Sequence, residues 1–236
     1  MNPKKINFFN IGLSLADLFF LLEQISKNRS YMRATHNLFL KKKITINNLT
    51  ANLGSGVKND YLSLITKKIN LVQNFDFFKK ESKTVTLDLE KKFNLNKKFK
   101  SIILFNVLEH IYNKDILIKS ISKSLKKGDR LELFVPFMYK YHEDPEDYFR
   151  FTHKYLQKFL NQSGFKVKIT LIATGQLNVI LEILFKYLKF NSLKMIFAFI
   201  FIILNNIFKI FSKDFKKYYC GIHCSCIKLK WKSLVI

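Results

Sequence analysis

The sequence predicts an α/β fold built on a doubly wound, mostly parallel sheet of seven strands. Short apolar segments alternate with segments of helical periodicity between residues 48 and 174, a pattern typical of a parallel sheet covered by helices. One of them, Ser101–Phe105, is almost wholly apolar, as strands buried on both faces of a sheet are. Polar residues follow the carboxyl ends of several strands, where an open α/β sheet builds its ligand site.

Two helices are expected before this core. Residues 13–28 place five apolar side chains on one helical face, and Ser14 precedes them as a candidate cap: Leu15, Leu18, Phe19, Leu22 and Ile25. A second helix is expected near Ser30–Lys41. Residues 1–47 are therefore predicted to form a helical cover. Polar residues interrupt the segment and no small-residue cleavage site follows it, so we expect no secretion signal and a cytoplasmic location.

The predicted core spans residues 48–174. Its strands are expected at 48–53, 69–72, 84–87, 101–105, 130–135 and 165–172. The helices between them are expected at 60–67, 115–125 and 152–160. The middle helix is predicted to turn Leu117, Ile118, Ile121 and Leu125 inward, and Thr152 is predicted to cap the last one.

The remaining chain departs from the alternation of strands and helices. Residues 176–190 fit an amphipathic helix whose polar face carries Asn178, Glu182, Lys186 and Lys189. Met195–Leu204 is an unbroken apolar run, and Tyr219–Trp231 alternates like a strand. Residues 175–218 are therefore predicted to be a helical insertion, and residues 219–236 to hold the last strand of the core sheet and the C-terminus.

The chain is strongly basic. Lys and Arg number 41 against 17 Asp and Glu, giving a formal charge of +24. A basic surface attracts anionic partners such as a membrane leaflet, a nucleic acid or an acidic glycan. The accompanying richness in Asn, Ile and Phe fits an AT-rich coding sequence equally well. Because no nucleic-acid-binding module is recognisable, we expect no nucleic-acid partner.

Three short segments place polar groups at predicted strand ends. Asn52-Leu53-Gly54-Ser55-Gly56 follows the first strand of the core, and glycine lets a backbone approach a ligand closely, although ordinary turns use it too. Asn106-Val107-Leu108-Glu109-His110 follows the strand at 101–105. Tyr139–Thr152 gathers acids, aromatic residues, His and Arg after the strand at 130–135.

Together these segments resemble class I S-adenosylmethionine-dependent methyltransferases of the type 11 group, over roughly residues 48–174. The resemblance implies a Rossmann-like methyltransferase fold with an antiparallel last strand, and S-adenosylmethionine as the cofactor. The family usually has an Asp where this chain has Asn52, and often a third glycine after Gly56. The first cofactor motif is therefore altered.

The resemblance assigns the cofactor-binding residues. They are Asn52, Gly54, Ser55, Gly56, Gln73, Asp88, Asn106, Glu109 and His110. The glycine turn would hold the amino-acid portion of the cofactor, and Asp88 would lie near adenine. Gln73 stands where the family commonly has an acid for the ribose hydroxyls, with Asp76 close behind it as a substitute. Asp88 is otherwise interpreted as a solvated turn residue.

The second strong part of the resemblance is Tyr141–Thr152, which is similar to a signature of type 11 methyltransferases found with glycan-assembly enzymes. His142 is the candidate general base, because histidine titrates near neutral pH. Asp147 would orient His142 or pair with Arg150, and Tyr148 would hydrogen-bond the acceptor. The alternative is structural, with Asp147 and Arg150 locking the loop.

The C-terminal segment Cys220–Cys226 contains three Cys and His223, which invites a zinc interpretation. Four ligands within so short a segment are cramped, and strand alternation places Cys220, Cys224 and Cys226 on one face as small buried groups. We therefore predict no metal site.

The apolar segment 193–211 approaches the length of a membrane-spanning helix but contains Lys194, Asn205, Asn206 and Lys209. It fits better as part of an in-plane anchor over residues 176–212, with lysines reaching anionic headgroups. The protein would then be peripheral on the inner face of the membrane. The alternative is packing on its own domain or on a partner subunit.

The function predicted from these features is methyl transfer to the oxygen of a saccharide or lipid-linked glycan at the membrane surface. A catalytically inactive methyltransferase-like binding or scaffold protein is the alternative, and Asn52 and Gln73 motivate it. A nucleic-acid methyltransferase is a third possibility, which no recognised module supports.

Overall fold

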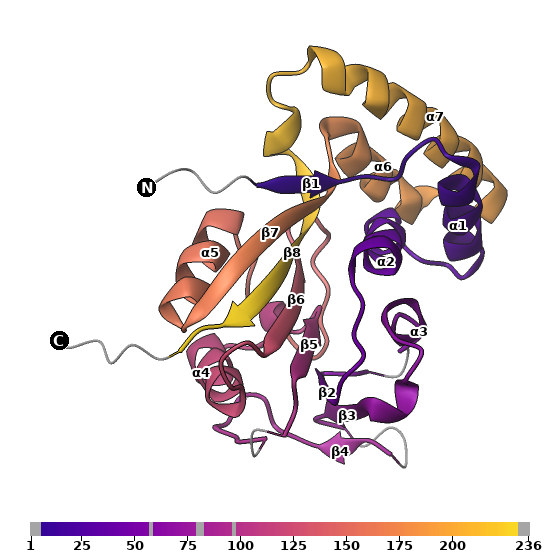
Figure 1. Ribbon diagram of the computed structural model, residues 1–236. Coiled ribbons are helices and arrows are strands. Elements are labelled where there is room, and N and C mark those ends of the chain that lie inside the picture. Colours follow the sequence, from indigo (N-terminus) through magenta and orange to yellow (C-terminus); the bar gives the residue numbers. More distant parts are fainter. Residues whose placement is uncertain (1–5, 57–58, 79–82, 96–97, 231–236) are drawn as a thin grey trace. The chain divides into compact units, whose positions relative to one another are not determined.

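A computed structural model describes residues 6–56, 59–78, 83–95 and 98–230 (Figure 1). The strands are β1 (Asn7–Phe9), β2 (Thr50–Leu53), β3 (Val72–Asp76), β4 (Val85–Thr86), β5 (Ser101–Phe105), β6 (Arg130–Pro136), β7 (Phe165–Thr174) and β8 (Tyr219–Lys228). The α-helices are α1 (Leu15–Ser26), α2 (Tyr31–Lys43), α3 (Leu62–Ile65), α4 (Lys114–Ser124), α5 (His153–Gln162), α6 (Gln176–Tyr187) and α7 (Asn191–Phe211). Three single-turn 3₁₀ helices are η1 (Ile69–Leu71), η2 (Leu108–His110) and η3 (Phe215–Lys217).

The strands form one sheet in the order β1-β7-β8-β6-β5-β2-β3-β4. Strands β6, β5, β2, β3 and β4 pair in parallel, and the last strand is antiparallel, so the doubly wound fold expected from the sequence is confirmed. The sheet has an eighth strand, because β1 pairs with β7 through Asn7↔Thr170 to Phe9↔Ile172. This strand lies in the segment that the sequence predicted to be a helical cover.

The chain divides into two compact units. The helical unit comprises Met1–Ile44, Pro136–Tyr141 and Thr170–Ile222. The core unit comprises Thr45–Val135, His142–Ile169 and His223–Ile236. Residues of the predicted N-terminal cover and of the predicted insertion thus fall in the same unit.

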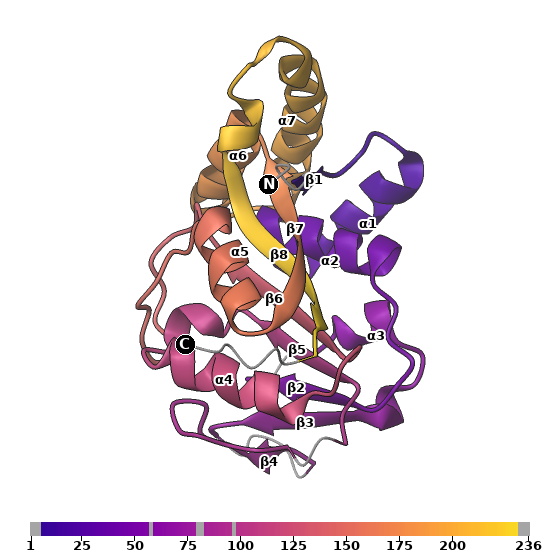
Figure 2. The same ribbon diagram turned by 60° about the vertical axis from the view of Figure 1, so that its left-hand side comes forward.

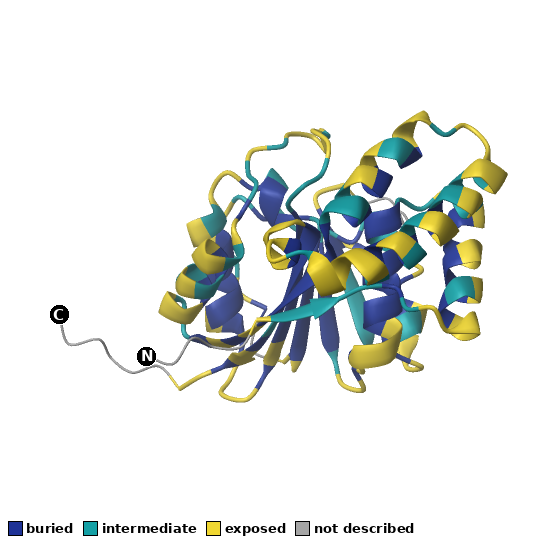
Figure 3. Ribbon diagram, turned by 90° about the horizontal axis from the view of Figure 1, so that it is seen from above, coloured by how far each residue is buried: buried dark blue, intermediate teal, exposed yellow. Residues whose placement is uncertain are grey.

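In the core unit, α4 and α5 cover one face of the parallel strands and α3 lies on the other (Figures 1 and 2). The inward face expected for α4 is confirmed, since Leu117, Ile118 and Ile121 are inaccessible to solvent and Leu125 nearly so. Thr152 caps α5 as predicted by accepting the Tyr155 N–H. Burial concentrates in the strands, which are mostly dark blue in Figure 3, while the outer turns of the helices are exposed.

The strand expected at 69–72 is placed wrongly. Residues Ile69–Leu71 form η1, and β3 runs from Val72 to Asp76. The cause is pairing with β2, whose partners Thr50↔Val72 to Leu53↔Phe75 fix the extended segment three residues further along the chain. Because of this shift, Asp76 and not Gln73 ends the strand.

In the helical unit, the buried face of α6 differs in part from the prediction. Asn178 and Glu182 of the expected polar face are buried, whereas Ile180 and Ile183 are exposed. Helix α2 supplies the reason: Asn178 Oδ1 accepts the Tyr31 hydroxyl at 3.0 Å, and Glu182 Oε2 accepts the Met32 N–H at 2.6 Å. Polar partners on a neighbouring helix allow these two polar side chains to be buried beside Leu181 and Phe185.

Helix α1 also differs from the expectation. Ser14 caps it as predicted, by accepting the Asp17 N–H at 3.2 Å. Of the predicted apolar face, Ile25 is buried as expected, but Leu15 and Phe19 are 74% and 68% exposed. The other buried apolar positions are Phe20 and Leu21.

Candidate functional site

The glycine turn after β2 and the end of β5 lie against each other. The two strands are parallel neighbours with Asn52 opposite Ile103, so their carboxyl ends meet at one sheet edge. Gly54 has φ +63°, and a Cβ added there would lie 2.5 Å from Val107 Cγ2. Gly54 is therefore required for the turn to pack on the residue that follows Asn106.

Gly56 has a different role in the turn. Its φ is +61°, and a Cβ added there would have no atom of the described residues within 4 Å, so this backbone faces space that those residues leave open. Beside it, the buried Ser55 hydroxyl has no hydrogen-bond partner among the described residues. An open glycine beside an unsatisfied hydroxyl is an arrangement that a polar ligand completes.

The acid at the end of β3 is Asp76. Its Oδ2 accepts the Gly56 N–H at 2.7 Å, and its Oδ1 accepts the Phe78 N–H at 3.1 Å. Gln73, predicted for this position, lies inside β3, and its amide donates to the Lys83 carbonyl at 2.9 Å. The structure thus brings Asp76 to the glycine turn and leaves Gln73 on the side of β4.

Asn52 lies in an interior network. Its side chain is fully buried, donates to Asn74 Oδ1 at 2.9 Å and accepts the Tyr61 hydroxyl at 2.8 Å. These bonds hold β2, β3 and the segment before α3 together. Asn52 therefore stabilises the strand from which the glycine turn begins.

Asp88 and Asn106 lie at the ends of β4 and β5. Asp88 accepts the Glu90 N–H at 3.0 Å and pairs with Lys91 at 3.0 Å, as a turn residue does. Asn106 is half-buried with φ +53°, a conformation that Asn tolerates better than most residues. Glu90 was not singled out in the sequence. Its two oxygens accept the N–H groups of Tyr112 and Asn113 and so tie this turn to the start of α4.

Glu109 is the most unusual group at this edge. It lies in η2 and is inaccessible to solvent, yet neither carboxylate oxygen accepts a hydrogen bond from another described residue. Burial raises the pKa of Glu109 to about 8, and the charge of Arg150 offsets part of the rise. The Nε2 atom of His110 lies 3.7 Å from Glu109 Oε1.

The loop at residues 142–152, which holds the second sequence motif, packs against η2. The Glu109 carbonyl accepts the N–H groups of Tyr148 and Phe149 at 2.9 and 3.2 Å. His110 Nδ1 lies 2.5 Å from the Glu146 carbonyl, and the His110 and His142 rings meet edge to face with centroids 4.9 Å apart. The two strongest sequence motifs therefore form one cluster.

Asp147 holds this loop through both interactions foreseen for it. Arg150 donates to its two oxygens at 2.5 and 2.6 Å, and the His142 N–H donates at 2.9 Å, with His142 Nδ1 3.3 Å away. Burial raises the pKa of Asp147, but the bonds from Arg150 and His142 outweigh it and bring the pKa to about 2. A permanently ionised Asp147 faces His142.

Tyr148 presents its ring on the outside of this cluster. It is 46% exposed and packs edge to face against Tyr112, with centroids 5.4 Å apart.

The cysteine-rich segment forms β8. Cys220, Cys224 and Cys226 are buried free thiols, and burial raises the pKa of each. His223 instead contacts Glu132, whose Oε2 lies 2.9 Å from His223 Nε2.

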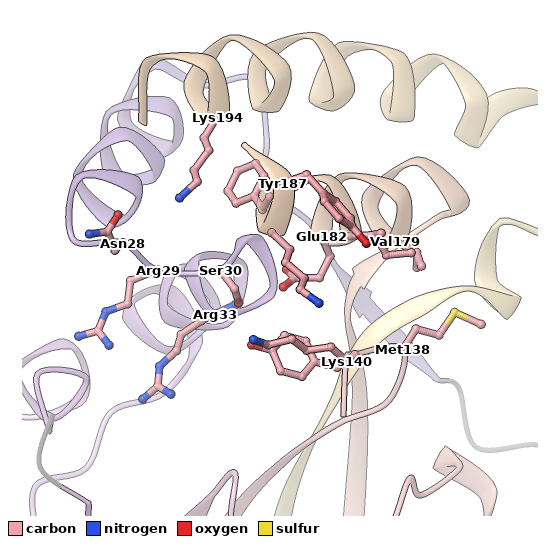
Figure 4. A pocket seen from close by; sticks show the side chains of 14 residues that line it. Asn28, Arg29, Ser30, Arg33, Met138, Lys140, Val179, Glu182, Tyr187 and Lys194 are labelled. Carbon is pink, nitrogen blue, oxygen red and sulfur yellow. The ribbon is translucent and has the colours of Figure 1, made fainter. Parts of the chain in front are cut away.

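The helical unit holds a basic cavity of about 820 Å³ (Figure 4). Its charged lining comprises Arg29, Arg33, Lys140, Lys186, Lys194 and a single acid, Glu182. Burial raises the pKa of Glu182 to about 7, which the Met32 N–H, the Ser30 hydroxyl and Lys140 partly oppose. A smaller, apolar cavity of about 250 Å³ lies between α1 and α7.

Helix α7 is exposed along most of its length. The most apolar 18-residue window of this 21-residue helix has a mean hydropathy of 1.9, and 17% of that window is buried. It is long and apolar enough to cross a membrane, by length and composition. Large apolar side chains at Ile196, Phe199, Ile210 and Phe211 are at least half exposed.

No family model matches the sequence, and no curated protein shows significant similarity to it. Solved structures do match. Phosphoethanolamine N-methyltransferase 2 of Haemonchus contortus, bound to S-adenosylmethionine, matches with TM-score 0.51 and 12% identity over 91% of this chain. The chain spans 57% of the length of that enzyme.

Two further structures have similar scores. An S-adenosylmethionine-dependent methyltransferase of Mesorhizobium loti matches with TM-score 0.51 and 10% identity, over 80% of this chain and 95% of its own. The [4+2]-cyclase SpnF matches with TM-score 0.54 and 11% identity, over 95% and 100%. These likenesses, with the parallel sheet and its antiparallel last strand, show that the chain has the fold of class I S-adenosylmethionine-dependent methyltransferases.

Proposed function

We propose that this protein is an S-adenosylmethionine-dependent methyltransferase. The observation that carries the proposal is the meeting of the glycine turn, Asp76 and the Glu109–His142 cluster at the carboxyl ends of β2, β3 and β5. Ligands of open α/β sheets bind at such an edge. The cofactor would supply an electrophilic methyl group, and the protein would supply positioning and a base.

The residues at the turn fit the cofactor's polar groups. Gly56 would receive its amino-acid portion, since its backbone faces space that the described residues leave unfilled, and the unsatisfied Ser55 hydroxyl is buried beside it. Asp76 would accept from the ribose hydroxyls with the lone pairs that its two backbone hydrogen bonds leave over. Asp88 and Asn106 remain the proposed contacts for adenine and for the centre of the cofactor.

His142 is the proposed base. Asp147 faces its Nδ1, which favours the tautomer that keeps the proton on Nδ1 and leaves Nε2 able to accept one. A buried carboxylate that orients a histidine in this way is a recurring arrangement in enzymes that activate hydroxyl groups. This pairing favours an enzyme over an inactive scaffold, although the match to a cyclase means that the fold alone does not fix the reaction.

The proposed acceptor is a hydroxyl of a saccharide or of a lipid-linked glycan at an anionic membrane surface. Two features of the helical unit support a membrane location: the exposed apolar side of α7 and the cationic lining of the 820 Å³ cavity. Leu15 and Phe19 of α1 line the small cavity together with Met195 and Phe199 of α7, which extends the apolar surface across two helices. Such a surface beside lysines and arginines suits the headgroup region of an anionic leaflet.

Calorimetric titration with S-adenosylmethionine tests the cofactor, and a screen of saccharide acceptors with methyl-labelled cofactor tests the reaction. Binding together with label transfer supports the proposal. Binding without transfer to any acceptor, or no binding at millimolar cofactor, favours the scaffold alternative.

A further inference from the structure

Three side chains at the strand-end cluster are arranged as metal ligands. Glu109, His110 and His142 each offer one ligand atom, and these atoms lie within 4.8 Å of one another. Ligand atoms about 2.1 Å from a tetrahedral ion are separated by about 3.4 Å, so small side-chain rotations bring the group to binding distances. The sequence did not suggest this group, because His142 is distant from the Glu109-His110 pair along the chain.

The state of Glu109 independently indicates a missing positive partner. Both of its oxygens are buried and accept no hydrogen bond from another described residue, while Oε1 lies 3.7 Å from His110 Nε2. A buried carboxylate without partners is costly for a fold. A cation bound between Glu109 and the two histidines removes that cost.

The histidines are already oriented as ligating histidines usually are. His110 Nδ1 is 2.5 Å from the Glu146 carbonyl, and His142 Nδ1 is 3.3 Å from Asp147 Oδ2. Metal-bound histidines almost always direct their second ring nitrogen to a backbone carbonyl or a carboxylate, which fixes the tautomer and the ring. Here one residue of each kind serves the two rings.

We propose that Glu109, His110 and His142 bind a divalent transition-metal ion through one carboxylate oxygen and two imidazole nitrogens. This mixed donor set suits ions such as Mn²⁺, Fe²⁺, Co²⁺ or Zn²⁺ better than Ca²⁺, which prefers oxygen ligands alone. Glu109 is inaccessible, whereas the His142 side chain is 28% exposed, so the ion would be open to solvent on the His142 side.

An ion with three protein ligands keeps coordination positions for an external oxygen and lowers the pKa of the oxygen that it binds. If the proposed function holds, one such position would take the acceptor hydroxyl, whose proton would pass to solvent on the open side of the ion, and His142 would act as a ligand instead of as a free base. This last step rests on the proposed function, whereas metal binding does not.

Titration of the metal-free protein with Co²⁺ tests the site, with calorimetry and visible absorption as readouts and without S-adenosylmethionine present. One ion per chain is expected, with the ligand-field bands of nitrogen and oxygen donors. Intense sulfur-to-cobalt charge transfer would place the ion on the cysteines of β8 and overturn the proposal, as would the absence of saturable binding.

Variants then assign the ligands. Glu109→Gln and His110→Asn are expected to weaken Co²⁺ binding at least about tenfold. His153→Asn, which alters a histidine at the start of α5, is the matched control and should bind as the wild type does. Equal affinity in all variants would exclude this site. The two proposals can fail separately. Wild-type protein that binds Co²⁺ but not S-adenosylmethionine would reject only the methyltransferase. Wild-type protein that binds S-adenosylmethionine but not Co²⁺ would reject only the metal site.

Discussion

The Gly56 N–H donates to the Asp76 carboxylate at 2.7 Å, and this bond joins the glycine turn to the end of the neighbouring strand. The pairing of Leu53 with Phe75 brings the two strand ends together, and Asp76 then holds the turn in shape. In the proposed function the same carboxylate binds the cofactor ribose. The conformation of the turn and the affinity for the cofactor therefore depend on one residue.

Asp76→Asn is expected to weaken S-adenosylmethionine binding about ten- to a hundredfold, because a bond to a charged acceptor contributes roughly 1.5–3 kcal/mol. Calorimetry measures the change. Gln73→Ala is the control, since the Gln73 amide is directed to the Lys83 carbonyl, and its affinity should stay near that of the wild type. The reverse order of effects would restore Gln73 as the ribose ligand.

The two glycines of the turn should respond differently to alanine. Gly54→Ala places a Cβ 2.5 Å from Val107, so its main effect should be on thermal stability, and Val107→Ala in the same chain should recover part of the loss. The Cβ of Gly56→Ala meets no atom of the residues that the structure describes, so the change should cost only about 1–2 kcal/mol of backbone strain, but it should obstruct the cofactor. Thermal unfolding with and without S-adenosylmethionine separates the two. Equal losses of stability would mean that both positions are structural.

The parts of the fold that could be predicted are those with a local signal. The apolar run of β5 gave its bounds correctly, and the spacing of Leu117, Ile118 and Ile121 gave the buried face of α4. Long-range partners explain the rest. Strand β1 exists because Asn7–Phe9 pairs with β7, and the buried face of α6 exists because Tyr31 and Met32 bond to its polar residues.

The candidate site follows the same division. Its motifs could be found because acids, histidines and glycines follow apolar segments. Which acid ends β3 depended on pairing with β2, and the meeting of His110 with His142 depended on the backbone bonds between Glu109 and the loop. Neither the acid that ends β3 nor the contact between the two histidines could be predicted from the residues next to them in the sequence.

His142→Ala is expected to abolish methyl transfer while leaving S-adenosylmethionine affinity within about twofold, because His142 belongs to the acceptor side of the cluster. Turnover of labelled cofactor and calorimetry on the same preparation measure both quantities. Tyr155→Phe, an exposed aromatic on α5, provides a control that should keep full turnover. Retained turnover in His142→Ala would remove His142 from the mechanism.

Membrane contact through α7 predicts a position-dependent effect of charge. Ile196→Asp on α7 should abolish flotation with anionic liposomes, because it places a carboxylate in the apolar surface that would enter the headgroup region. Ile69→Asp is a matched control, since Ile69 is 54% exposed and Ile196 is 55% exposed. Wild-type protein that remains at the bottom of the gradient would instead indicate that α7 packs against protein.

Glu182 should make the stability of the helical unit depend on pH. Burial raises its pKa from 4.5 to about 7, so the folded protein binds this proton more tightly than the unfolded chain does. The stabilisation is complete below pH 4.5 and is lost as the pH rises through about 7, when Glu182 must ionise while buried. The free energy of unfolding should fall by on the order of 2–3 kcal/mol across this window.

Glu182→Gln keeps an oxygen that can accept the Met32 N–H but cannot ionise. Denaturant unfolding should therefore find the variant close to the wild type at pH 5 and more stable than the wild type at pH 8. Asp214→Asn, at an exposed ion pair with Lys217, should show no such crossing and serves as the control. If Glu182→Gln is destabilised equally at both pH values, the Glu182 carboxyl is held ionised by the cationic residues around the cavity, and its burial does not control the pH dependence.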